Sequence, residues 1–258
     1  MGSLSYYGIL ALAVFLHMTS WFIISLLKKR NDVADIAWGL GFITSTWLAF
    51  FLSGFQSARS IIVQLLVTIW GARLAWHIYL RNKNKHEDIR YAEWRKEWGK
   101  WFILRSYLQV FLLQGVLLYL ISVPVFFIQK NSLTTIHIVD FIGVVVWIIG
   151  FYFESVGDSQ LKRFISLPEN RGKIMQTGLW KYTRHPNYFG EVTQWWGIFI
   201  IALSLPNGWV TIIGPLTITI LILFVSGIPL LEKRHAGRPE YEEYNKKTSI
   251  FFPLPPKK

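Results

Sequence analysis

The sequence predicts an all-α, polytopic integral membrane protein with about seven transmembrane helices, its N-terminus outside and its C-terminus in the cytoplasm. Hydrophobic residues make up 52% of the 258 residues and charged residues only 16%, a composition too apolar for a soluble domain of this length. Apolar runs recur along the chain and are separated by polar loops. The basic residues gather in alternate loops, as expected for loops that stay in the cytoplasm.

Seven segments are apolar enough to be candidate spans, because a spanning helix needs roughly 20 apolar residues. A charge at the bilayer centre costs about 2.5 to 3.5 kcal/mol, so the segments end where charged residues begin. They cover residues 5–27, 33–53, 60–80, 104–128, 136–156, 192–204 and 210–231. The sixth segment is the shortest.

The distribution of the basic residues gives the predicted orientation. Of the 27 Lys and Arg residues, Arg59, Arg73 and Lys130 are the ones outside four loops that face one side of the membrane. The formal charge of +12 therefore reflects topology, and its dispersal over four loops does not favour a nucleic-acid partner. The chain has no cysteine, which excludes disulfides and thiolate chemistry.

Two of the cytoplasmic segments are larger than a turn, and a third forms the tail. Residues 81–103 mix tryptophan with basic residues, which predicts a helix lying at the membrane interface. Residues 157–191 are polar and contain several glycines, so they are able to fold over a ligand. We expect the tail from Glu232 onwards to pack beside that loop. With no internal repeat and no long linker, one membrane domain is the simplest prediction.

Ionisable residues inside predicted spans are functional candidates, because burying them without partners is costly. Asp35 lies early in the second span, Arg73 and His77 share a face of the third, and Glu154 and Asp158 share a face of the fifth. The alternative is that they pair with one another and lock helices together, for example Asp35 with Arg73.

The segment TRHPNYFGE, residues 183–191, is the densest chemical cluster. Arg184 offers a fork suited to phosphate, Asn187 an amide able to hold another amide, and Glu191 a carboxylate. Pro186 should break any helix there and free backbone donors near the N-terminus of the following helix, which would suit an anionic cofactor. Headgroup contact is the alternative for the basic residues. The histidines lack zinc-site spacing, so we expect no metal. The sequence also lacks a Walker motif and a dinucleotide fingerprint.

Several motifs together resemble a known family. DIAWGLGF, WGARLAWH, HEDIRY, DSQLKRF, GLWKYTRHPNYFGE and SGIPLLEKR begin at residues 35, 70, 86, 158, 178 and 226. On these motifs the sequence resembles the bacterial membrane proteins of the DUF1295 type, which are related to the C-terminal domain of steroid 5α-reductases. The resemblance covers residues 31–254 and implies one such membrane domain over residues 1–258.

In steroid 5α-reductases the corresponding loops and helix ends bind NADPH, and the nicotinamide meets a lipid-like enone in the membrane. The resemblance therefore implies NADPH as cofactor and a lipid or steroid-like substrate taken from the bilayer. It makes Asp158, Lys173, Asn187 and Glu191 cofactor contacts, with Glu154 near the place of a family asparagine. The remaining residues expected at this site are Lys162, Tyr182, Arg184, His185 and Tyr188.

The sequence departs from the reductases where they use a Gln-Glu pair and a Tyr as proton donors. Asp35 is the expected carboxyl here, and Trp70 takes the place of the Tyr, with Arg73 one turn inward. The candidate catalytic residues are thus Asp35, Arg73 and Glu191.

Three functions compete. The first is an NADPH-dependent reductase of a carbon–carbon double bond conjugated to a carbonyl. The second is a membrane methyltransferase of the isoprenylcysteine or phospholipid type that uses S-adenosylmethionine, because RHPxYxG occurs there too. The third is a lipid-binding protein without catalysis. Each belongs in a bacterial inner membrane or an endoplasmic reticulum membrane, with the site facing the cytoplasm.

Overall fold

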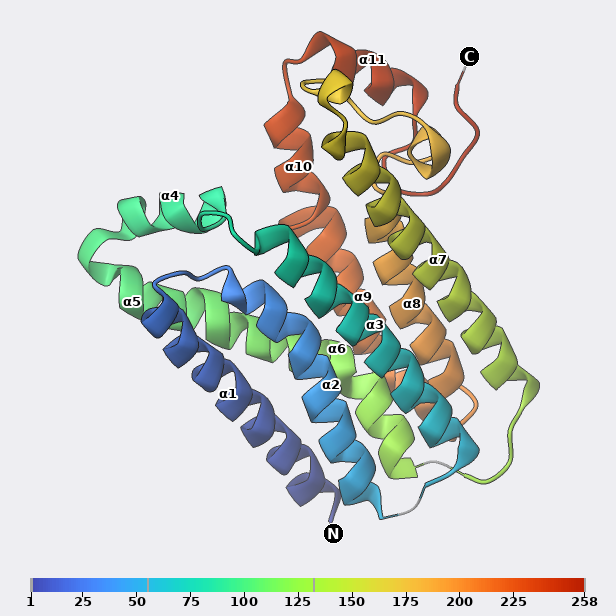
Figure 1. Cartoon of the computed structure of the whole chain (residues 1–258). Helices are drawn as coiled ribbons and strands as arrows, with labels where there is room; N and C mark the ends of the chain where they lie inside the picture. Colours follow the sequence, from blue (N-terminus) through green and yellow to red (C-terminus); the bar gives the residue numbers. More distant parts are fainter. Residues whose placement is uncertain (1, 55, 132, 258) are drawn as a thin grey trace. The chain divides into compact units, whose positions relative to one another are not determined.

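A computed structural model describes residues 2–54, 56–131 and 133–257, and its regular elements are helices. An isolated β-bridge joins Thr183 and Ser249. The elements in order are α1 (Ser3–Lys28), α2 (Val33–Ser53), α3 (Ala58–Asn82), α4 (Ile89–Trp98), η1 (Gly99–Trp101), α5 (Phe102–Arg105), η2 (Ser106–Leu112), α6 (Leu113–Asn131), α7 (Ile138–Ser166), η3 (Pro168–Asn170), η4 (Gly178–Lys181), α8 (Pro186–Ala202), η5 (Gly208–Ile212), α9 (Ile213–Ile220), η6 (Leu221–Val225), α10 (Ile228–His235) and α11 (Pro239–Lys247). Figure 1 shows them along the chain.

Six segments of the described chain are long and apolar enough to cross a membrane, which confirms the all-helical membrane class. They are Ser3–Lys28, Val33–Ser53, Ala58–Asn82, Ile89–Asn131, Ile138–Ser166 and Gly208–His235. The short sixth span of the prediction falls in α8, which has 17 residues and a length of about 25 Å. Seven crossings and the orientation of the termini stay predictions, because length and composition identify spans but not the side on which each terminus lies.

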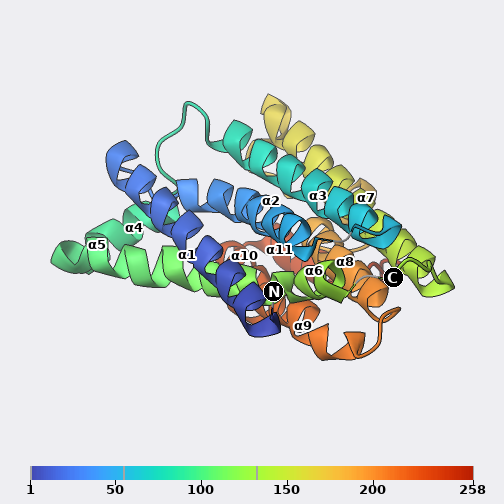
Figure 2. The ribbon, with the colours of Figure 1, turned by 90° about the horizontal axis from the view of Figure 1, so that it is seen from below.

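The helices form two compact units, and the single domain expected over the whole chain stays a prediction. Unit 1 comprises Met1–Ile136 and Leu205–Ile213, and unit 2 comprises His137–Ser204 and Gly214–Lys258. In unit 1, α1, α2, α3 and α6 lie side by side (Figures 1 and 2). A Cβ on Gly39 of α2 would lie 2.8 Å from the carbonyl oxygen of Gly71 in α3, so these two helices pack with their backbones close together.

The predicted interfacial segment 81–103 contains α4. Asp88 caps this helix, its side chain accepting a hydrogen bond from the backbone amide of Arg90 at 3.0 Å. The rings of Trp94 and Trp98 stack along α4 with centroids 5.2 Å apart. Aromatic rings beside basic side chains are typical of helices at a membrane interface.

In unit 2, α7 and α8 pack antiparallel along their length, and glycines fix how they are aligned. A Cβ on Gly150 of α7 would lie 2.6 Å from the carbonyl oxygen of Gly190 in α8. At the start of α8, Gly157 of α7 lies against Pro186 and Asn187. Small residues let transmembrane backbones approach this closely, and any shift would bring side chains into backbone.

The rest of unit 2 folds back on the polar loop between α7 and α8. After α11 the tail runs beside residues 182–184: Arg184 N donates to Ser249 O at 2.9 Å, and Leu254 N donates to Tyr182 O at 3.0 Å. The Tyr244 hydroxyl donates to the carbonyl of Trp180. These contacts confirm that the tail packs beside the loop.

Candidate functional site

The alignment of α7 and α8 brings two α7 carboxylates, Glu154 and Asp158, each onto an amide side chain of α8. Asn187 Nδ2 donates to Asp158 Oδ1 at 3.1 Å. One turn earlier on α7, Glu154 accepts a hydrogen bond from Gln194 Nε2 of α8, and both side chains are buried. The two carboxylates share a face of α7, as their spacing predicted. Of the two, Asp158 lies nearer the polar loop, and Glu154 lies deeper in the span.

Several polar atoms in this region are buried without a hydrogen-bond partner among the described residues. They are Ser155 Oγ, His185 Nδ1, Asn187 Oδ1 and Gln194 Oε1. A buried polar atom left unpaired costs about 1 to 3 kcal/mol, so such atoms are uncommon in protein interiors. Two of these four atoms, Asn187 Oδ1 and Gln194 Oε1, are amide oxygens of α8 that can only accept. Both therefore require a partner that offers a hydrogen-bond donor.

Arg184 and His185 are held by Glu232 of α10. Two nitrogens of Arg184 donate to the two oxygens of Glu232 at 3.1 and 3.0 Å, and His185 Nε2 lies 2.9 Å from Glu232 Oε1. Arg184 Nη1 also donates to Thr248 O at 2.8 Å. Arg184 is only 5% exposed and His185 only 3%. Most of the guanidinium donors are therefore occupied by the protein, and a direct contact of Arg184 with a cofactor stays a prediction.

Sequence reasoning missed Glu232 as a site residue, and it missed its third partner, Tyr241. The Tyr241 hydroxyl donates to Glu232. Burial, then the hydrogen bond to Glu232, raises the pKa of Tyr241, so its hydroxyl remains a donor at neutral pH. Glu232 lies inside the SGIPLLEKR motif, but 48 residues separate it from Arg184 and no sequence spacing connects the two.

The other residues predicted at this site are more exposed. Lys162 lies on the exposed surface of α7, Tyr182 is exposed before the β-bridge, and Tyr188 stacks on His185 with centroids 5.7 Å apart. Glu191 is half-buried in the second turn of α8. Lys173 lines a cavity of about 280 Å³ together with Ile174, Gln176, Glu240 and Glu243. The carboxylates opposite Lys173 make this cavity a mixed polar site.

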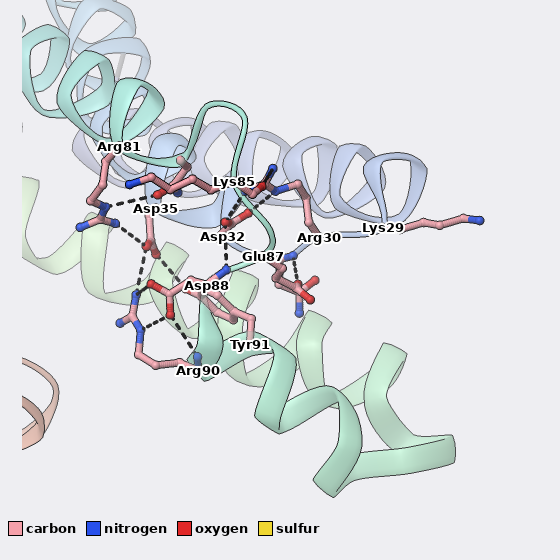
Figure 3. Close-up of polar contacts among 12 residues, drawn as sticks. Lys29, Arg30, Asp32, Asp35, Arg81, Lys85, Glu87, Asp88, Arg90 and Tyr91 are labelled. Carbon is pink, nitrogen blue, oxygen red and sulfur yellow. Dashed lines mark hydrogen bonds and ion pairs between the residues drawn. The ribbon is translucent and has the colours of Figure 1, made fainter. Parts of the chain in front are cut away.

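Asp35, the predicted catalytic carboxyl, belongs to unit 1 and lies in a dense charge cluster (Figure 3). Its Oδ1 accepts from the Tyr91 hydroxyl at 2.8 Å, and its Oδ2 accepts from Arg90 at 3.2 Å, with Arg81 3.6 Å away. The structure thus gives Asp35 two arginine partners at the adjoining ends of α2, α3 and α4. A locking role explains these contacts, and its catalytic role stays a prediction.

The same cluster continues around Asp32 in the turn before α2. Arg30 holds both oxygens of Asp32 at 2.6 Å, and the Asp88 amide donates to Asp32 at 3.2 Å. Burial alone would raise the pKa of Asp88, but hydrogen bonds and charge from Arg90 outweigh it and lower that pKa. The cluster therefore joins the α1–α2 turn to the α3–α4 loop. Arg73 lies half-buried on α3, two turns before Arg81, and its predicted catalytic role is untested.

Comparison with known proteins gives the family context of these sites. A family model described as "Protein of unknown function (DUF1295)" matches residues 21–248. An uncharacterised protein of Schizosaccharomyces pombe is 24% identical over 265 residues, covering 89% of this chain and 74% of the yeast protein. No solved structure matches.

Two relatives have named activities. The 3-oxo-5-alpha-steroid 4-dehydrogenase 1 of Bos taurus is 30% identical over 113 residues, and that of Rattus norvegicus is 25% identical over 114 residues. Each match covers 43% of this chain and 40% of the relative. This distant similarity over part of the chain supports an oxidoreductase class.

Proposed function

We propose that this chain, which belongs to the DUF1295 family, is a membrane reductase that uses NADPH. Its substrate is a lipid or steroid-like molecule with a carbon–carbon double bond conjugated to a carbonyl. The similarity to two steroid dehydrogenases supports the reaction class. The observation that carries the proposal is the unpaired, buried oxygen of Asn187 at the start of α8.

The chemistry of this end of unit 2 fits a reduced nicotinamide dinucleotide. The carboxamide of nicotinamide has an N–H group that can donate a hydrogen bond to Asn187 Oδ1. Asp158 fixes the Asn187 amide by accepting from its nitrogen, so the free oxygen has a defined direction. The N-terminus of α8 carries the positive end of a helix dipole, which favours the charge of a diphosphate.

When bound, the dinucleotide supplies a hydride for the carbon–carbon double bond. The residues of this chain bind and orient it. Asn187 holds the carboxamide, and Asp158 fixes the Asn187 amide. The contacts of Glu232 with Arg184 and His185 keep the segment before Asn187 in place. Reduction also requires a group that polarises the substrate carbonyl and a proton donor.

Binding measurements on the purified protein test the proposal. Energy transfer from the tryptophans to NADPH reports binding in detergent micelles. We expect Asn187→Ala and Glu191→Ala each to weaken NADPH binding about tenfold, a loss of about 1.4 kcal/mol. Lys181→Ala is the matched control, because Lys181 is exposed in the same segment, and its affinity should be unchanged.

The competing functions give different results. Binding of S-adenosylmethionine without NADPH would overturn the proposal in favour of a methyltransferase. A loss for Lys181→Ala larger than those for Asn187→Ala and Glu191→Ala would show that the segment attracts NADPH through its positive charge, not through these two side chains. Mass spectrometry of the lipid that copurifies with the protein would then identify the substrate class.

A further inference from the structure

The outer face of the C-terminal tail is unusually apolar for a segment that follows a polar helix. Ile250 is 44% exposed, Phe252 64% and Leu254 54%, whereas Phe251 between them is 6% exposed. Phe251 points inward and packs on Phe189 of unit 2. Residues 250–254 therefore present apolar side chains both inward and outward.

Hydrogen bonds hold this face in place against the loop before α8. Thr183 Oγ1 donates to Phe251 O at 2.8 Å, and Leu254 N donates to Tyr182 O at 3.0 Å. Tyr182, itself 42% exposed, adds its ring to the same region of the surface. The apolar side chains are thus presented by a fixed backbone.

The position of the tail along the membrane normal follows from α7 and α8. From Ile138 at the start of α7 to Gly157, which lies against Pro186, the helix rises about 29 Å, close to the hydrocarbon thickness of a bilayer. Taking Ile138 as one edge of the hydrocarbon places the first turn of α8 at the opposite membrane–water boundary. Phe252 packs on Phe189 of that turn, with ring centroids 6.1 Å apart.

The charges next to the apolar face complement a lipid surface. Lys246 and Lys247 end α11, where Lys247 pairs with Glu243 at 2.5 Å. Lys257 N donates to Lys247 O at 2.9 Å, which brings a third lysine to the end of α11. Each basic residue near an anionic membrane surface contributes about 1 kcal/mol to binding. Apolar side chains beside lysines match the boundary between acyl chains and headgroups.

We infer that the outer face of the tail, formed by Ile250, Phe252 and Leu254, inserts into the interfacial layer of the bilayer. The tail is then fixed on two sides, by lipid and by the loop that carries Tyr182, Thr183 and Arg184. Lipid contact thereby stabilises the segment leading to Asn187. This inference rests on packing and depth and is independent of the proposed reductase activity.

Site-directed spin labelling tests it directly, because the chain has no cysteine to remove. Ile250→Cys and Leu254→Cys are labelled singly with a nitroxide in the full chain, reconstituted in vesicles of phosphatidylcholine and phosphatidylglycerol. Both sites lie on the outer face, so the label leaves the buried Phe251 untouched. Glu242→Cys, on the exposed surface of α11, is the matched control.

We expect oxygen, which partitions into lipid, to reach labels at 250 and 254 more readily than a water-soluble nickel chelate does. At 242 the order should be reversed. Nickel accessibility at 250 and 254 equal to that at 242 would overturn the inference. Dipolar broadening that disappears on dilution with unlabelled protein would overturn it too, because it would place a second copy on this face.

Discussion

The charge cluster around Asp35 in unit 1 and the polar cluster around Asn187 in unit 2 both contain residues that the sequence marked as functional, but their bonding differs. Asp35 accepts from Arg90 and Tyr91, with Arg81 close by. In the Asn187 cluster, Asp158 fixes one end of the amide and the other end stays unpaired. Saturated bonding stabilises a fold, whereas an unpaired buried acceptor is suited to a ligand. The comparison favours unit 2 as the place where the cofactor binds.

The largest effect is expected from Arg184→Ala in unit 2. The substitution leaves Glu232 without its bidentate partner and the Thr248 carbonyl without its donor, so unfolding should become easier by about 3 kcal/mol. Thermal unfolding in detergent measures the change, with the exposed Arg163→Ala as control. If Arg184→Ala kept full stability and lost only NADPH binding, Arg184 would contact the cofactor directly.

A smaller effect is expected from Gly150→Ala, which tests the α7–α8 alignment beneath the Asn187 cluster. The added Cβ would lie 2.6 Å from the Gly190 carbonyl oxygen, so the helices must separate, at a cost of about 1 to 3 kcal/mol. NADPH affinity should fall as well, because Asp158 and Asn187 move apart. Gly8→Ala is the control, since a Cβ there meets no atom within 4 Å. Equal unfolding temperatures for the two variants would contradict this account of the packing.

The smallest effect is expected from Asp35→Asn in unit 1. Arg81 and Arg90 are nearly half exposed, so losing the charge should cost about 1 kcal/mol of stability. NADPH affinity should not change, and Glu93→Gln on the exposed surface of α4 serves as control. Loss of enone reduction at unchanged stability would instead show that Asp35 takes part in the chemistry.

The sequence was informative where physical constraints act over a short stretch of chain. The hydrocarbon of the bilayer demands long apolar helices, so the start and end of α2 at Val33 and Ser53 were predicted correctly. Helix geometry placed Glu154 and Asp158 on one face without any tertiary information. A helix break at Pro186 was predicted because proline lacks a backbone N–H, and α8 begins there.

The sequence by itself determined the membrane class, the α-helical architecture and the polar segment 183–191, because composition and helical periodicity are local properties. Tertiary structure decided the partners. Arg184 pairs with Glu232, and Asp35 pairs with Arg81 and Arg90. The tertiary structure also leaves the side chains of Ile250, Phe252 and Leu254 exposed on the outer face of the tail. Contacts between residues about 50 positions apart depend on how helices align. In unit 2, the close approach of Gly150 and Gly190 sets the alignment of α7 and α8. The spacing of motifs along the sequence does not predict this approach.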